Sequence, residues 1–132
     1  FQSEVAKPTI NINLNEASVL NSNKAYLESI ILNLITNSLK FKSENRALEI
    51  NITASKIGNI TTILFSDNGI GIDLKRNRNK VFGLYQRFHN HSDSRGLGLY
   101  LVKSQVETMG GTIEIESEAN KGTTFTLTFK NT

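Results

Sequence analysis

Three polar residues in the first third of the chain have a spacing that suits a metal ion and a phosphate group. They are Asn33, Asn37 and Lys40, which follow one another at intervals of four and three residues. In a helix they would lie within about 60° of one another and form one polar stripe. Mg²⁺ bound to phosphates needs few protein oxygens, so a single asparagine amide is an adequate ligand. The alternative is that both asparagines face water.

A glycine-punctuated loop, Asp67-Asn68-Gly69-Ile70-Gly71, follows an apolar stretch and could bind a base. An aspartate at the end of a buried strand, before two glycines, can face a pocket whose floor is bare backbone. An ionised carboxylate only accepts hydrogen bonds, so it suits the exocyclic amine of adenine and would repel the carbonyl oxygen of guanine. The alternative is an Asx-type turn that closes a strand.

A third candidate runs from Ser94 to Leu99, where Gly96 and Gly98 lie at the start of a helical pattern. Glycines at a helix N-terminus leave backbone N–H groups free to face an anion, and the helix dipole favours the negative charge. Neither G-x-x-x-x-G-K-[ST] nor G-x-G-x-x-G occurs in the chain, which disfavours P-loop and Rossmann chemistry.

The composition fits one globular domain. The chain has 132 residues, 38% of them apolar, and common domains have roughly 100–150 residues. We therefore expect a single domain over residues 1–132. The absence of cysteine excludes disulfides and thiolate metal sites. A net charge of +3 is too small to indicate a nucleic-acid binder by itself.

The charge is uneven along the chain. Between residues 73 and 95 six basic residues stand against two aspartates, which suits a compact polyanion such as a triphosphate. No apolar run reaches the roughly 18 residues of a membrane span, and the N-terminus has no signal-peptide pattern. Because the chain begins at Phe1 and its one methionine is Met109, we expect it to be a segment of a longer protein.

Hydropathy patterns predict the elements that position these residues. Apolar and polar residues alternate, as in half-buried strands, over 10–14, 47–56, 60–67, 112–118 and 123–130. Gly58-Asn59 and residues 119–122 are the expected hairpin turns. A helical period begins at Asn23, and a second helix is expected over about 97–109. The fold class is therefore α+β, a mostly antiparallel sheet with helices packed on one face.

The order and spacing of these segments resemble the ATP-binding domain of sensor histidine kinases. That domain belongs to a superfamily shared with DNA gyrase, the heat-shock chaperone ATPases and the mismatch-repair ATPases. The matching segments are NLITNSLKF at 33–41 (N box), DNGIGI at 67–72 (G1 box), FGLYQR at 82–87 (F box), GLGLYLVK at 96–103 (G2 box) and GTTF at 122–125 (closing strand). The resemblance covers nearly the whole chain and implies a Bergerat-type two-layer α/β sandwich. In that fold ATP lies between the helical layer and a mobile lid over about 73–95.

The resemblance also implies roles in the N box and the base pocket. It assigns Asn37 to Mg²⁺ and places Asn33 and Lys40 on the phosphate side. It assigns Asp67 to the adenine amine, with Thr123 supporting that contact through its hydroxyl or a shared water.

For the glycine boxes and the lid, the resemblance implies further contacts. Gly69 and Gly71 clear room for the base, and Gly96-Leu97-Gly98-Leu99 approaches the phosphates. In the lid, Phe82 and Tyr85 provide an apolar anchor. Arg87 reaches the γ-phosphate or the acceptor domain, and so joins Asn33 and Lys40 as a candidate catalytic residue.

The chain departs from the family pattern at three places. Ser94 stands where the second glycine box usually opens with a glycine, and Ser38 replaces the usual alanine after the metal-binding asparagine. The lid has no glycine between Gly83 and Gly96. These departures bear on lid geometry more than on nucleotide binding.

Two histidines lie in the expected lid. His89 and His91, with Asp93, could suggest a metal cluster, but neither a strand nor a helix is expected there to hold the ligands. The family's phosphoacceptor lies in a histidine-acid-leucine-arginine pattern, which is absent here. Both histidines are therefore interpreted as lid surface.

The resemblance implies that the chain binds Mg·ATP and transfers the γ-phosphoryl group to a histidine on a separate helical-hairpin domain of the same protein. A response regulator receiver domain acts downstream in such two-component systems. Isolated domains of this kind would hydrolyse ATP slowly, because Asn33 stands where gyrase-type relatives have a glutamate that activates water. We expect a cytoplasmic domain with no nucleic-acid partner and no direct membrane contact, in a parent protein that is either soluble or membrane-anchored.

Four alternative functions are compatible with parts of this pattern. A gyrase-type or chaperone-type clamp shares the pocket but needs the missing carboxylate. A nucleotide-sensing module without transfer activity and an anti-sigma-type serine kinase share the boxes. A basic nucleic-acid module ranks last, because aromatic residues are not interleaved with the charges as a stacking platform.

Overall fold

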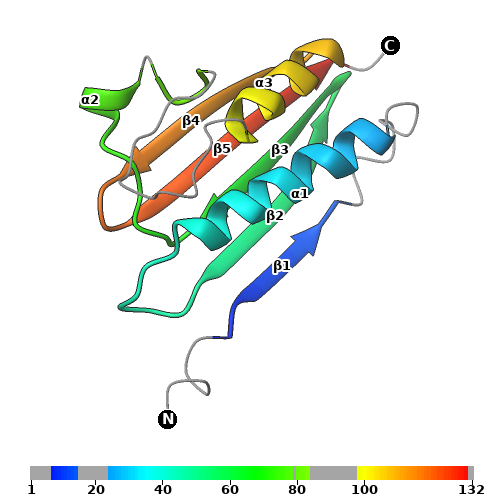
Figure 1. Ribbon diagram of the computed structural model, residues 1–132. Helices are drawn as coiled ribbons and strands as arrows, with labels where there is room; N and C mark the ends of the chain where they lie inside the picture. Colours follow the sequence, from blue (N-terminus) through cyan, green and yellow to red (C-terminus); the bar gives the residue numbers. More distant parts are fainter. Residues whose placement is uncertain (1–6, 15–23, 79, 84–97, 131–132) are drawn as a thin grey trace.

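The alternating segments form one mixed sheet, and two helices lie against one face of it (Figure 1). The computed structural model describes residues 7–14, 24–78, 80–83 and 98–130. In chain order the elements are β1 (Thr9–Asn13), α1 (Lys24–Lys40), β2 (Glu49–Ile57), β3 (Ile60–Asp67), α2 (Leu74–Asn77), α3 (Gly98–Thr108), β4 (Thr112–Glu118) and β5 (Gly122–Lys130).

The strands lie in the order β1-β2-β3-β5-β4. β1 runs parallel to β2, and the other three pairs are antiparallel. The parallel pair follows from α1, which carries the chain from the end of β1 back to the start of β2. The predicted mostly antiparallel sheet with helices on one face is therefore confirmed, including both hairpins.

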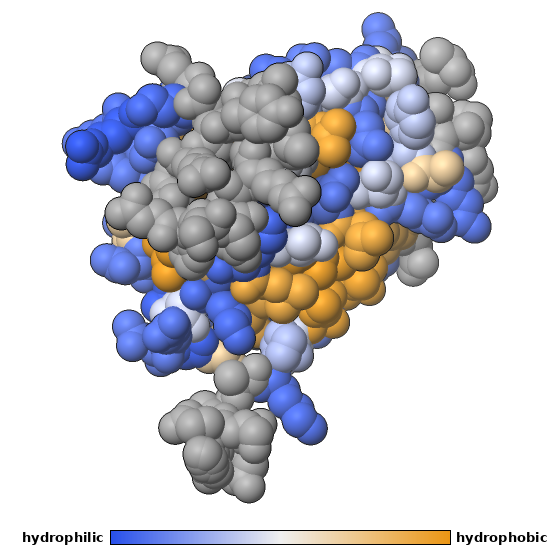
Figure 2. Space-filling view, viewed as in Figure 1, coloured by the Kyte–Doolittle hydropathy of each residue, from blue (hydrophilic) through white to orange (hydrophobic). Residues whose placement is uncertain are grey.

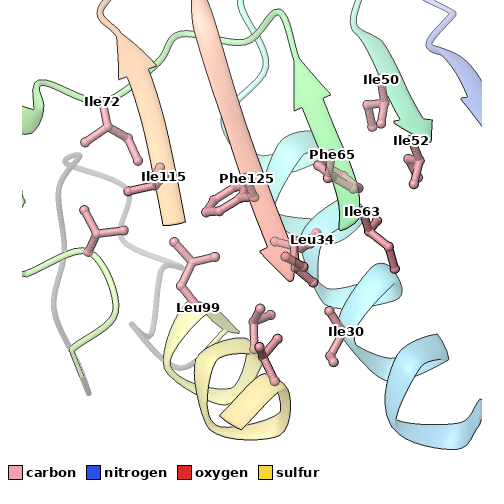
Figure 3. Close-up of a cluster of buried hydrophobic side chains, with 14 of the residues drawn as sticks. Ile30, Leu34, Ile50, Ile52, Ile63, Phe65, Ile72, Leu99, Ile115 and Phe125 are labelled. Atoms are coloured by element: carbon pink, nitrogen blue, oxygen red, sulfur yellow. The ribbon is translucent and has the colours of Figure 1, made fainter. Parts of the chain in front are cut away.

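The core fills the space between the sheet and the two long helices. Side chains alternate between the faces of a strand, so Ile63 and Phe65 of β3 and Phe125 of β5 all point to the helices, where they are fully buried. The helix α1 contributes Ile30 and Leu34, which are also fully buried (Figure 3). Ser38 continues this line of the helix one turn further, at the end where the strand β3 finishes.

The second long helix, α3, ends at a glycine pair, as the sequence predicts. Gly110 has a φ of 81°, which glycine adopts without steric cost. The N–H of Gly111 then donates to the carbonyl of Val106 at 2.9 Å, which satisfies one of the free carbonyls at the helix end.

The short helix α2 was not expected, because four residues are too few to show a helical period. Asp73 caps it by accepting a hydrogen bond from the N–H of Lys75 at 3.1 Å. Leu74 and Val81 are buried in the core, and the ring of Phe82 packs edge-on against Phe125, with 6.3 Å between centroids. The described first part of the predicted lid segment, 73–78 and 80–83, is therefore anchored on the sheet.

One edge of the sheet, strand β1, is not covered by the described helices. β1 lies beyond the reach of α1, so Ile10 and Ile12 remain 40% and 56% exposed although they sit beside the buried Ile50 and Ile52. Figure 2 shows an apolar area on the face of the molecule where α1 and β1 lie. Among the described residues, none of the helices has the length and apolar character of a membrane-spanning segment.

Candidate functional site

The apolar face of the sheet ends in a row of polar residues. Asp67, the last residue of β3, is the register partner of Thr123 on β5, and Thr123 is in turn the partner of Ser117 on β4. All three lie on the strand face that carries the core, because Asp67 follows the inward-facing Phe65 by two residues. Three strands therefore bring three polar side chains to one end of the helix-covered face.

The carboxylate of Asp67 is held by two donors from different elements. Oδ1 accepts from the N–H of Gly69 at 2.9 Å. Oδ2 accepts from the hydroxyl of Ser38 on α1 at 2.6 Å, and Ser38 is only 2% exposed. Each carboxylate oxygen has two lone pairs, so each keeps one acceptor position for a ligand.

The hydroxyl of Thr123 is oriented by its neighbour on β4. Ser117 Oγ accepts from the N–H of Ile72 and donates to the carbonyl of Gly122, both at 2.8 Å. Since a hydroxyl has one proton, the 2.8 Å contact between Ser117 and Thr123 must have Thr123 as its donor. Thr123 is left with acceptor lone pairs, so it has the same hydrogen-bonding character as the adjacent Asp67.

Close backbone approaches explain why glycine occurs around this row. A Cβ at Gly71, whose φ is 74°, would lie 2.1 Å from the carbonyl oxygen of Glu118. A Cβ at Gly69 would lie 2.6 Å from the carbonyl oxygen of Phe41, and one at Gly122 would lie 2.1 Å from that of Asp67. The absence of side chains thus lets three loops pack together. Whether Gly69 and Gly71 also clear room for a base stays a prediction.

Arg46 fastens the glycine loop to the β4–β5 turn, a role that the sequence did not suggest. Its Nε donates to the carbonyl of Asn68 at 2.7 Å. Its Nη2 donates to the carbonyls of Gly69 at 2.8 Å and Asn120 at 2.9 Å. Nothing in the polar stretch around Arg46 distinguishes it from a solvated surface arginine, because all three partners are distant in the chain.

Asn68 was also missed, since a residue between aspartate and glycine suggests only a turn. Its side chain continues the hydrogen bonding between β2 and β3 beyond the last residue of β3. Oδ1 accepts from the N–H of Glu49 at 2.8 Å, and Nδ2 donates to the carbonyl of Ala47 at 3.0 Å. The loop that follows Asp67 is therefore held from both sides.

The polar stripe of α1 lies beside its buried line. Asn33 and Asn37 are partly buried and Lys40 is exposed. The two asparagine side chains make no hydrogen bond to any other described residue. Asn37 is the chain neighbour of Ser38, so α1 brings the predicted metal ligand to the end of the helix that contacts Asp67.

The second glycine box is described only in part. Gly98 is the first residue of α3, is exposed and has open space around the position of a Cβ. Leu99 is 5% exposed and lies in the core near Ile115 and Phe125 (Figure 3). A nucleotide contact by either residue stays a prediction.

Several predicted residues lie outside the described part of the chain: Tyr85, Arg87, His89, His91, Asp93, Ser94, Gly96 and Leu97. Within the described part, no three or more His, Asp or Glu residues are grouped so that they could hold a metal ion.

Comparison with protein families shows the family to which this domain belongs. Residues 22–132 match the model of the histidine kinase-, DNA gyrase B- and HSP90-like ATPase family. The chain belongs to this family. The match spans α1, the Asp67 loop and the closing strand β5, so the polar row belongs to an ATPase family domain that binds a nucleotide.

Curated members of this ATPase family resemble the chain over most of its length. Heme sensor protein HssS from Staphylococcus saprophyticus subsp. saprophyticus is 35% identical over 115 residues, which cover 87% of this chain and 24% of that protein. Histidine protein kinase SaeS from Staphylococcus aureus is 30% identical over 125 residues, or 91% of this chain and 35% of that protein. The chain thus spans about a quarter to a third of these relatives.

Solved structures confirm the fold of this ATPase family domain. The mycobacterial sensor histidine kinase MprB superposes with a TM-score of 0.71 at 18% identity, over 93% of this chain and 83% of that one. The catalytic domain of histidine kinase ThkA gives a TM-score of 0.71 at 19% identity, over 94% and 79%. The predicted two-layer α+β sandwich is therefore confirmed.

Proposed function

We propose that this domain binds Mg·ATP and passes the γ-phosphoryl group to a histidine on a separate domain of the same protein. In this proposal the chain is the catalytic part of a sensor histidine kinase in a two-component system. The proposal is supported above all by the Asp67 carboxylate, which is fixed by two donors and still has free acceptor positions. Relatives named as sensor proteins and histidine kinases match over 83% to 91% of this chain.

Base recognition follows from the acceptors of the polar row. The exocyclic amine of adenine donates hydrogen bonds, and Asp67 and Thr123 both present lone pairs. The 6-oxo group of guanine is itself an acceptor and would face like charge. A buried polar group left unpaired costs about 1–3 kcal/mol, which is enough to give the site a clear preference.

The phosphate end is assigned to the polar stripe of α1. The amide oxygens of Asn33 and Asn37 have no partner among the described residues and are partly sheltered, so they fit a cation that prefers oxygen ligands. Asn37 would hold Mg²⁺, with Asn33 and the exposed Lys40 on the phosphate side. When bound, Mg²⁺ supplies neutralising charge to the phosphate oxygens.

The transfer step needs little covalent help from this chain. A nitrogen lone pair of a neutral imidazole forms a bond to the γ-phosphorus while the bond to the bridging oxygen breaks and ADP leaves. Because the imidazole is already nucleophilic, no general base is needed from this domain. Its own residues position the nucleotide and neutralise charge, which is where most of the rate acceleration in phosphoryl transfer arises.

We propose the phosphoacceptor hairpin domain of the same protein and, downstream, the receiver domain of a response regulator as partners. We also place the domain in the cytoplasm, where ATP is available. Neither a nucleic acid nor a membrane surface is part of this proposal.

Transfer of label from γ-labelled ATP tests the proposal. With Mg²⁺ and the parent protein's phosphoacceptor domain, label is expected on that domain as an acid-labile, alkali-stable phosphoramidate. Asp67→Asn is expected to abolish it at limiting ATP while leaving the circular dichroism spectrum unchanged. Acid-stable label would instead indicate a serine kinase, and tight nucleotide binding without any transfer would indicate a sensing module.

A further inference from the structure

The hydroxyl of Ser38 is the one side-chain donor from α1 that contacts Asp67 among the described residues. It is 2% exposed, lies 2.6 Å from Oδ2 and stands one position after the proposed metal ligand Asn37. A short contact of this kind, between a hydroxyl and a carboxylate, is a strong hydrogen bond. Its neighbours along the same helix line, Ile30 and Leu34, are apolar, and the bond to Asp67 is the hydrogen bond that the described residues show for this hydroxyl.

We propose that Ser38 is a specificity-determining residue that sharpens the preference of the Asp67 pocket for a 6-amino purine. This inference rests on the proposed function, because it assumes that Asp67 receives the base. Ser38 acts through Asp67 and therefore counts as a positioning residue, not a catalytic one.

Two donors fix the plane of the carboxylate. The Gly69 N–H holds Oδ1 from the loop, and Ser38 holds Oδ2 from the helix above. Rotation of the carboxylate about its Cβ–Cγ bond would break both hydrogen bonds at once. The remaining lone pairs of Asp67 therefore keep constant directions. Binding of the base then costs no entropy for orienting the carboxylate.

The same hydrogen bond uses the only proton that Ser38 could offer to a ligand. With its proton directed to Asp67, the hydroxyl presents only lone pairs to the pocket. Thr123, whose proton is directed to Ser117, is in the same state. The side chains of Ser38, Asp67 and Thr123 thus offer acceptors alone, so they favour a 6-amino group and give no hydrogen bond to a 6-oxo group.

Calorimetry with three diphosphates measures this selectivity. ADP carries the 6-amino group, purine riboside diphosphate carries hydrogen at position 6, and inosine diphosphate carries oxygen there. The wild-type chain is expected to bind ADP more tightly than the other two. In Ser38→Ala the ADP affinity should fall about tenfold, the range of a lost charge-assisted hydrogen bond, while the affinity for the 6-hydrogen analogue changes less than about twofold.

Controls separate selectivity from folding. Alanine is smaller than serine, so Ser38→Ala introduces no clash, and its circular dichroism and melting curve verify the fold. Ser38→Cys, which keeps only a weak donor, should give an intermediate ADP affinity. Thr36→Ala is the matched control on the same helix, because Thr36 is exposed and bonds only to the carbonyl of Leu32 at 2.9 Å. It should leave all three affinities unchanged.

The outcomes are distinguishable. Equal losses for ADP and the 6-hydrogen analogue in Ser38→Ala would overturn the inference, since they would show a general structural role. An unchanged ADP affinity would overturn it as well. If the wild-type chain itself fails to distinguish the two nucleotides, adenine recognition by Asp67 fails first, and the proposed function is lost together with the inference.

Discussion

The hydroxyl of Thr123 points its proton at Ser117, 2.8 Å away across the β4–β5 ladder, because Ser117 has already directed its own proton to the carbonyl of Gly122. This orientation leaves lone pairs of Thr123 beside Asp67, its register partner on β3. The β4–β5 pair therefore determines that Thr123 presents hydrogen-bond acceptors beside Asp67 on β3. The consequence is a row of acceptors at the end of a sheet face that is otherwise apolar.

Removing the hydroxyl should affect the ligand more than the fold. Thr123→Val keeps the shape, and Ser117 retains its bonds to Ile72 and Gly122. We expect the free energy of ADP binding to become less favourable by about 1 kcal/mol, the value of one lost hydrogen bond, with little change in melting temperature. Calorimetry and thermal denaturation measure the two effects. Thr123→Ser restores the hydroxyl and should restore binding; a loss as large as in Thr123→Val would contradict the assigned role.

Gly71→Ala should destabilise the domain through a backbone clash. The added Cβ would lie 2.1 Å from the carbonyl oxygen of Glu118, and the φ of 74° is unfavourable for alanine. Gly58→Ala is the matched control, because its φ is 60° but nothing lies within 4 Å of the Cβ. We expect about 1 kcal/mol of destabilisation for Gly58→Ala and clearly more for Gly71→Ala in urea denaturation. Equal destabilisation in the two variants would mean that the β4–β5 turn shifts to accommodate the added Cβ at position 71.

Arg46→Ala should loosen the Asp67 loop. The change removes the donors to Asn68, Gly69 and Asn120, which join the loop to the β4–β5 turn. Because Arg46 is exposed, we expect a modest loss of about 1 kcal/mol in the free energy of unfolding. Faster amide hydrogen exchange should appear at the loop and the turn. Arg46→Lys keeps the charge but not the planar fork, so it should recover only part of the protection; full recovery would indicate that charge alone matters.

The sequence predicted what depends on local pattern. The alternation over 60–67 marks β3 correctly to its last residue, Asp67, because one face of that strand is buried. The burial of Ser38 was not predicted, because a serine adds nothing to an apolar period; the structure places it in line with Ile30 and Leu34.

What the sequence could not provide depends on contacts between distant segments. Ser38 and Asp67 are 29 residues apart, and their contact exists because α1 crosses the sheet at one particular position. The three carbonyl partners of Arg46 come together only when the turn folds back onto the loop. The short helix α2 is set by its cap at Asp73 and the burial of Leu74, since four residues carry no period.

Magnesium dependence should separate the two asparagines of α1. If Asn37 is the metal ligand, Asn37→Ala should remove most of the gain in affinity for a non-hydrolysable ATP analogue that Mg²⁺ gives over EDTA. Asn33→Ala should keep that gain, because its amide is assigned to the phosphate side. Calorimetry with and without Mg²⁺ measures both variants. If Asn33→Ala lost the gain and Asn37→Ala kept it, Asn33 would be the metal ligand and Asn37 would lie on the phosphate side.

Asn33 should also limit hydrolysis by the isolated domain. An amide cannot accept the proton that an attacking water must lose, so no general base is available at this position. Slow ATP hydrolysis is therefore expected, and Asn33→Ala should not raise that rate. Asn33→Glu introduces a carboxylate that could accept the proton and should raise the rate. Release of inorganic phosphate from the isolated domain measures all three chains. Brisk hydrolysis by the wild-type chain that disappears in Asn33→Ala would show that this side chain activates water. The proposal that this domain only positions ATP for a histidine on another domain would then be wrong.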